Sequence, residues 1–195
     1  QGLVAGLNAA KKAMGGTPVF FSRSESYIGV MVDDLINRGV TEPYRMFTSR
    51  AEYRLTLRAD NSDQRLTPKG IEVGCVGIQR SEAFERKRDQ LAAVKNTLCD
   101  LTETPTNLRA AGIRVNQDGV RRSAYDLLAY PDIDMTVLSK VWPDLAVITA
   151  DIRKQVENDA LYATYASRQK AEVEALRRDE EIAIPSELSF SDMRG

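Results

Sequence analysis

Apolar residues recur at helical spacing along most of the chain, and glycine or proline follows several of these segments. The pattern predicts helices over residues 1–14, 27–37, about 81–98, 125–130, 135–142 and about 150–182. Thr67-Pro68 is typical of the N-cap and first position of one more short helix. The chain is therefore predicted to be mainly α-helical.

One segment leaves room for a small β element. Asp118-Gly119 lies between two short apolar stretches, residues 113–115 and Val120, and an Asp-Gly pair favours a hairpin turn. A small β-hairpin and a surface loop are both compatible with this pattern.

The most unusual stretch is residues 41–67, where arginine is interleaved with aromatic and acidic residues. Its arginines are Arg45, Arg50, Arg54, Arg58 and Arg65. The aromatic residues among them are Tyr44, Phe47 and Tyr53, and the acids are Glu42, Glu52, Asp60 and Asp63. Unlike lysine, arginine has a planar guanidinium that binds phosphate or carboxylate in a bidentate manner and stacks on aromatic rings. We call residues 41–67 the arginine motif.

Two backbone conformations compete for this motif. Ser49 and Glu52 fit a capping box, which favours a helix that starts there. The alternation of apolar and polar residues over 53–58 fits a strand instead. We favour the helix because of the cap. Residues four apart share a face in both structures, so we expect Arg54 and Arg58 on one side of the chain.

From the residues alone, the arginines have two interpretations. They contact phosphates, with an aromatic neighbour stacked on a splayed base, or they form structural ion pairs with the acids of the motif. Asp33-Asp34 poses a similar choice between a metal or acid–base site and a solvated helix face or an ion pair to an arginine. We favour the structural interpretation for that pair.

Composition narrows the classes of function. The net charge of −1 does not indicate a broadly basic nucleic-acid-binding protein, so an RNA site must be local. Residues 38–69 hold seven basic residues against four acids, 7 − 4 = +3.

No apolar run is long enough for a membrane helix, and no signal peptide is evident. Two cysteines without a CxxC pair, and no histidine, argue against an ordinary zinc site and favour a reducing cytoplasm. We expect Cys75 and Cys99 to be partly buried thiols.

Several motifs together resemble one family. EPYRMFTSRAEYRL and LRADNSDQRLT within residues 42–67, QGLVAGLNAA at 1–10 and YIGVMVDDLINRG at 27–39 are similar to the MnmG/GidA family. The members are tRNA uridine 5-carboxymethylaminomethyl modification enzymes. IPSELSFSDMRG at 184–195 also resembles the family, whereas residues 100–145 do so only loosely.

The resemblance implies an enzyme that binds FAD, uses NADH, takes a one-carbon unit from methylenetetrahydrofolate and modifies carbon 5 of the tRNA wobble uridine. It also implies a cytoplasmic homodimer, with no membrane association, that works with a GTPase partner and binds the tRNA anticodon stem-loop. By resemblance we assign a flavin contact to Gln1, since free amides at a helix start stabilise negative charge. We assign tRNA contacts to Arg45, Arg50, Arg54, Arg58 and Arg65, with the flavin pocket wall as the alternative.

Part of the family's machinery is not found in this sequence. A dinucleotide-binding fold needs a G-x-G-x-x-G turn in a βαβ unit, and none of the 12 glycines forms one. The two cysteines do not fall in the matched motifs. We therefore expect a C-terminal fragment without most of the FAD domain and without the extreme C-terminal helices. We assign it no catalytic residue and no metal ligand, and we expect the isolated fragment to be inactive and to bind neither FAD nor NADH.

The expected fold is mainly α, a helical domain with a small β element as one option, plus a C-terminal helix left over from a Rossmann-type FAD domain. The expected divisions are 1–20 for that remnant, 21–100 for a linker and helical module with the arginine motif, and 101–195 for a helical domain with the long helix at about 150–182. The expected role of the fragment is tRNA binding and domain packing. Two alternatives stay open: a related folate- and FAD-dependent tRNA uridine methyltransferase, and a non-catalytic helical partner-binding module.

Overall fold

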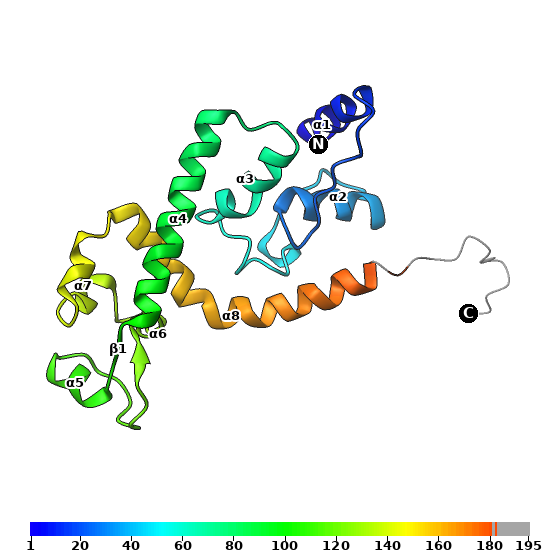
Figure 1. The fold of residues 1–195 in the computed structure, drawn as a ribbon. Coiled ribbons are helices and arrows are strands. Elements are labelled where there is room, and N and C mark those ends of the chain that lie inside the picture. The colour runs from blue at the N-terminus through cyan, green and yellow to red at the C-terminus, as the bar shows by residue number, and fades with distance from the viewer. Residues whose placement is uncertain (181, 183–195) are drawn as a thin grey trace, which may run out of the picture.

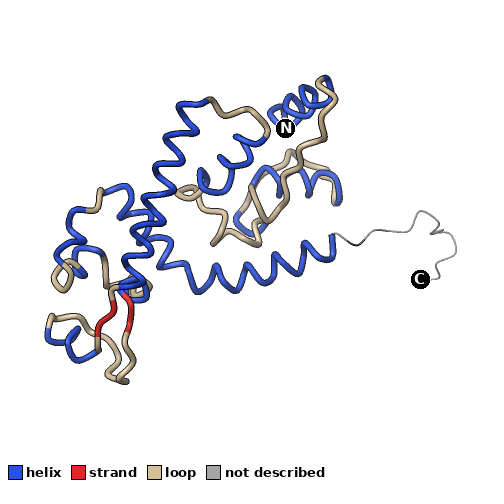
Figure 2. Tube along the Cα trace, in the orientation of Figure 1, coloured by secondary structure: helices blue, strands red, loops and turns tan. Residues whose placement is uncertain are grey.

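The computed structural model describes residues 1–180 and 182 and is mainly α-helical (Figure 1, Figure 2). The helices are α1 (Gly2–Ala13), α2 (Tyr27–Asn37), α3 (Ser62–Glu72), α4 (Ile78–Asp100), α5 (Pro105–Ala110), α6 (Ala124–Leu127), α7 (Met135–Leu138) and α8 (Ala150–Glu180). The other elements are the 3-10 helices η1 (Thr48–Arg50) and η2 (Pro143–Val147) and the strands β1 (Thr102–Glu103) and β2 (Arg122–Ser123). The predicted fold class is confirmed. The family-like segment at 184–195 lies outside the described residues.

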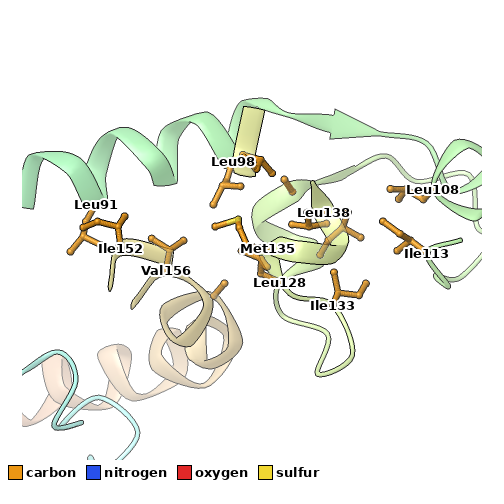
Figure 3. Close-up of a cluster of buried hydrophobic side chains, with 14 residues drawn as sticks. Leu91, Leu98, Leu108, Ile113, Leu128, Ile133, Met135, Leu138, Ile152 and Val156 are labelled. Carbon is orange, nitrogen blue, oxygen red and sulfur yellow. The ribbon is translucent and has the colours of Figure 1, made fainter. Parts of the chain in front are cut away.

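The larger hydrophobic core lies where α4 meets α6, α7 and the first half of α8 (Figure 3). The buried apolar residues of α4 recur every seven positions and therefore share one helix face. Leu98 is fully buried, and Leu91 lies against Ile152 and Val156 of α8 (Figure 3). Burying one such side chain contributes about 1.5–3 kcal/mol, so this cluster fixes α4 against α8.

A smaller apolar cluster holds the arginine motif against α2 and the far end of α8. Val30, Tyr53 and Leu57 are buried in it, and Val173 and Leu176 of α8 pack against them. Helix α8 therefore runs unbroken from the larger core to the arginine motif (Figure 1). Its continuous course sets the position of the motif relative to the rest of the chain.

Helix α2 begins and ends where the sequence indicates. The Ser26 hydroxyl accepts a hydrogen bond from the Gly29 amide at 3.0 Å and so caps the first turn. Gly29 is needed because a Cβ there would lie 2.0 Å from the backbone oxygen of Ser22. Gly39, just past the helix end, has a φ of 64°, which lies in the left-handed region that favours glycine.

The small β element exists, but it pairs other residues than the predicted hairpin. Strands β1 and β2 are antiparallel, with Thr102 opposite Ser123 and Glu103 opposite Arg122. Residues 113–115 and Val120 are not strands, so the alternative of a loop is correct there. Asp118 holds this loop through Arg122 Nη2 at 2.7 Å. The Arg122 hydrogen bond lowers the pKa of Asp118 to about 2.

The predicted helix from Ser49 is wrong, and so is the strand alternative. Only Thr48–Arg50 form a 3-10 turn, and turns follow as far as Leu57. The capping box does not form, because the Glu52 carboxylate instead accepts hydrogen bonds from Arg23 at 2.7 and 3.2 Å. A tight turn, with Leu57 N 2.8 Å from the Tyr53 carbonyl, brings both of these side chains into the smaller cluster.

The predicted helix start at Thr67-Pro68 is also wrong. Helix α3 begins upstream at Ser62, so Pro68 lies inside it. Asp63 in the first turn favours this start, since a carboxylate is stabilised at a helix N-terminus. It is also held by Lys87 of α4, whose Nζ lies 2.6 Å away. A contact to a distant helix thus outweighs the local signal from proline.

Candidate functional site

Arg54 and Arg58, which their spacing placed on one face, have different surroundings in the structure. The chain between Ala51 and Leu57 forms tight turns, neither the helix nor the strand on which that expectation rested. Arg54 is exposed, whereas the Arg58 side chain is only 12% exposed.

Arg58 is bound to two carboxylates and an aromatic ring. Its Nε lies 3.0 Å from Asp60 Oδ1, its Nη2 donates to Asp159 of α8, and its guanidinium lies 5.1 Å from the centre of the Tyr162 ring. Burial disfavours the charge, but the hydrogen bonds to Asp60 and Asp159 prevail and raise the pKa of Arg58. The ion-pair interpretation is therefore confirmed for this arginine, although Asp159 was not among its predicted partners.

Arg65 binds backbone and amide oxygens instead of acids. It donates to the Glu25 carbonyl, to the Arg58 carbonyl at 3.0 Å and to Asn61 Oδ1 at 2.9 Å. Burial lowers the pKa of Arg65. These bonds tie the loop before α2 to the start of α3, which gives Arg65 a structural role whatever else it contacts.

Arg50 belongs to a polar cluster around a buried acid. Asp34 of α2 is 1% exposed, and its carboxylate contacts Arg50 Nη1 at 3.4 Å, the Tyr44 hydroxyl at 2.9 Å and Arg23 Nη1 at 3.4 Å. Burial tends to raise the pKa of Asp34, but the hydrogen bonds from Tyr44 and Arg50 and the charge of Arg23 outweigh it and lower the pKa. The structural interpretation of Asp33-Asp34 is confirmed, since Arg23 pairs with both carboxylates.

Beside this cluster lies an open groove of about 610 Å³. Three arginines, Arg38, Arg45 and Arg50, line it, together with one acid, Glu42. Counting these side chains gives 3 − 1 = +2, a local concentration of positive charge on a chain whose net charge is −1. We call this the arginine groove. Its net positive charge attracts anions.

Of the aromatic residues in the motif, the structure leaves one free to stack on a ligand. Tyr53 is buried in the smaller cluster. Tyr44 lies beneath the Arg50 guanidinium, 5.0 Å from it, and its hydroxyl is bound to Asp34. Phe47 lines the groove, is 50% exposed and lies 5.1 Å from the Arg45 guanidinium. A base could therefore stack on Phe47 without unfolding the cluster.

The start of α1 offers a partial fit to a flavin. Gln1 is exposed and makes no side-chain capping bond, and a Cβ at Gly2 or Gly6 would meet no atom within 4 Å. Free amides in open space suit an anionic group. The described residues contain only an antiparallel two-stranded sheet, so they lack the βαβ unit that cradles a dinucleotide pyrophosphate. They therefore do not form a complete FAD site, and the Gln1 contact stays a prediction.

The remaining candidates are the two cysteines and any metal-binding or membrane-spanning element. Cys75 and Cys99 are exposed, so the expectation of partly buried thiols is wrong. Among residues 1–180 and 182, no group of three or more His, Cys, Asp or Glu side chains could hold a metal ion. No helix in the same residues is long and apolar enough to cross a membrane.

The sequence interpretation missed two residues of this site. Arg23 and Asp159 lie outside the motif and reach it only through folding. Arg38 was counted in the basic segment 38–69 but was not named as a contact, and it lines the groove with Arg45 and Arg50. The fold and groove together define a helical domain with a local concentration of positive charge.

Comparison with known proteins identifies the family of this domain. Residues 79–170 match a family model described as "tRNA modifying enzyme MnmG/GidA C-terminal helical domain". Two curated relatives, both named "tRNA uridine 5-carboxymethylaminomethyl modification enzyme MnmG", align with 100% of this chain. The one from Granulibacter bethesdensis is 42% identical over 195 residues, and the one from Bacillus subtilis is 38% identical over 200 residues. The chain belongs to the MnmG/GidA family.

Solved structures agree with this assignment. GidA of Aquifex aeolicus in its form II crystal has a TM-score of 0.82 and 31% identity over 98% of this chain and 30% of that one. Its form I crystal gives a TM-score of 0.80 at the same identity, over 100% of this chain. The chain spans about a third of the length of the curated relatives, 31% and 32% for the two named above.

Proposed function

We propose that this chain is the part of an FAD- and NADH-dependent enzyme that binds tRNA and packs the domains together while carbon 5 of the wobble uridine is modified. The relatives named as tRNA uridine modification enzymes support the reaction class. The observation that carries the binding role is the arginine groove, with Arg38, Arg45, Arg50 and the exposed Phe47. FAD would supply the redox chemistry, and the start of α1 would contribute one edge of its site.

The groove divides the recognition between charge and stacking. Arg45 and Arg50 would contact phosphates of the anticodon stem-loop, and Phe47 would stack on an unpaired base. Arg54 is exposed outside the groove lining and would add a peripheral phosphate contact. Arg58 and Arg65 would act through the fold, by holding the motif on α8 and α3. The enzyme would work in the cytoplasm as a homodimer with a GTPase partner.

Binding of tRNA over a series of salt concentrations tests this proposal. Each phosphate contact contributes roughly 0.7–0.9 to the log–log salt slope. We expect Arg45→Ala and Arg38→Ala each to weaken binding and to flatten the slope by that amount. Arg86→Ala is the matched control, because Arg86 is an exposed arginine of α4 that does not line the groove. Slopes for Arg45→Ala and Arg38→Ala that equal the control slope would exclude the groove as the tRNA site.

A non-catalytic partner-binding role has one observation in its favour. Tyr165 and Leu161 of α8 are four residues apart, on one helix face, and are 55% and 36% exposed. Tyr165→Ala would then abolish association with a GTPase or a second copy without changing tRNA binding, a result that pull-down and tRNA titration would separate.

A further inference from the structure

The most enclosed charge near the arginine groove is the Asp34 carboxylate. A carboxylate removed from water costs several kcal/mol unless it is paired and hydrogen-bonded, so its partners are defined by the fold and not by chance. Oδ1 faces Arg23 at 3.4 Å, and Oδ2 faces both Arg50 at 3.4 Å and the Tyr44 hydroxyl at 2.9 Å. One oxygen is thus directed to the interior and the other to the groove.

Arg23 does not need Asp34 for its own neutralisation. It pairs with Asp33, and with Glu52 at 2.7 Å, and its side chain is only 11% exposed. The carboxylates of Asp33 and Glu52 therefore neutralise the Arg23 guanidinium without any contribution from Asp34. This leaves Oδ2 of Asp34 available to orient the side chain on its outer side, which is Arg50.

Arg50 is held on one side and open on the other. Its guanidinium rests on the Tyr44 ring at 5.0 Å and its Nη1 contacts Asp34, yet its side chain is 37% exposed and lines the groove. Nη1 makes the only hydrogen bond of this guanidinium among the described residues. A guanidinium has five N–H donors, so an edge remains for a bidentate contact to a phosphate in the groove.

We propose that Asp34 and Tyr44 are positioning residues that hold the Arg50 guanidinium in the orientation that receives a phosphate of the RNA backbone; this rests on the proposed function of the groove. A free arginine side chain loses rotamer freedom when it binds a ligand, whereas one already stacked and hydrogen-bonded loses less. Ordering one such side chain costs about 0.5–1.5 kcal/mol, which corresponds to a roughly 2- to 10-fold change in Kd.

The sign of the effect separates positioning from simple electrostatics. Removing a negative charge next to a polyanion site should tighten RNA binding if only the net field matters. Positioning predicts the reverse: Asp34→Asn should weaken binding about 2- to 10-fold, with the salt slope unchanged because no phosphate contact is lost. Tyr44→Phe keeps the ring beneath Arg50 but removes the hydroxyl that fixes Asp34, so it should weaken binding in the same direction.

A double-mutant cycle with Arg50→Ala tests the inference, with an RNA anticodon stem-loop as the probe. We expect Arg50→Ala to weaken binding and to flatten the salt slope by roughly 0.7–0.9. In the Arg50→Ala background, Asp34→Asn and Tyr44→Phe should then have no further effect. Urea unfolding of each variant checks that the titrated protein is folded. If Asp34→Asn does not fold, Tyr44→Phe replaces it in the double-mutant cycle.

The other outcomes are equally informative. Tighter binding by Asp34→Asn, or losses that add fully to that of Arg50→Ala, would overturn the positioning role and leave the groove function intact. An Arg50→Ala variant that binds like wild type would instead remove Arg50 from the RNA site. If Arg38→Ala and Arg45→Ala were unaffected as well, the proposed function itself would fail.

Discussion

Replacing Arg58 by alanine should reveal whether this arginine serves the fold before it serves a ligand. Its guanidinium makes contacts to Asp60, to Asp159 of α8, to the Leu55 carbonyl at 3.3 Å and to the Tyr162 ring. The substitution removes all of these together. It leaves two carboxylates near each other without the cation that holds them.

The structure sets the size of the effect. Breaking a buried ion pair by removing one partner costs about 3–5 kcal/mol. Here Asp60 and Asp159 are 32% and 31% exposed, and Gln155 still donates to both, at 3.1 and 3.2 Å. Partial solvation and these remaining hydrogen bonds reduce the cost, so we expect a loss of about 2–3 kcal/mol in the free energy of unfolding. Arg54→Ala, at an exposed position, should change it by less than about 0.5 kcal/mol.

Urea denaturation followed by far-UV circular dichroism measures both variants on the same scale. A matched cycle with Asp159→Asn should give a coupling of at least about 1 kcal/mol, because the two residues are in direct contact. If Arg58→Ala were as stable as Arg54→Ala, the ion-pair role of Arg58 would be refuted. Arg58→Ala and Arg54→Ala also serve as controls for the RNA titrations, because weaker binding by a partly unfolded protein gives no information about phosphate contacts.

Three further expectations concern the core, a close approach and pH. Leu98→Ala should cost about 2–5 kcal/mol in urea unfolding, whereas Leu3→Ala, 72% exposed, should cost less than about 0.5 kcal/mol; equal losses would contradict the packing of α4. Gly29→Ala should destabilise by at least about 1–3 kcal/mol because its Cβ would lie 2.0 Å from a backbone oxygen, while Gly6→Ala, with open space, should be neutral or stabilising by up to about 1 kcal/mol in thermal melts. Burial raises the pKa of Tyr125 to about 12. The contribution of Tyr125 to the free energy of unfolding is therefore complete below its unfolded pKa of about 10 and declines as the pH rises towards 12. Over that pH window the wild type should lose more stability than Tyr125→Phe. Parallel pH profiles of the two proteins would contradict the shift.

The sequence was most informative where burial has a local period. The seven-residue spacing of Leu91 and Leu98 and the apolar face of α2 locate their helices without any knowledge of the partners. The glycine signal worked in the same way, since Gly39 follows the end of α2 with φ 64°. These features depend on neighbours within one or two helical turns, which is the range that a sequence pattern covers.

Local signals failed where a distant residue competed for the same group. The capping box at Ser49 was lost because Arg23 takes the Glu52 carboxylate, and the helix start moved upstream of Pro68 to Ser62. The paired strands likewise join Thr102–Glu103 to residues about twenty positions away instead of closing the nearer hairpin. Each of these outcomes rests on a contact between segments that the local pattern treats separately.

By itself, the sequence determined the helical class, the extent of the main helices and the family, because periodic burial and a dense motif are local properties of the chain. The tertiary structure alone decided which arginines are available. Arg58 is held by Asp159, 101 residues away, and Arg50 is held by Asp34 of α2, whereas Arg45 remains exposed in the groove. The five arginines are chemically identical, so their roles differ only through the partners that folding brings to each one.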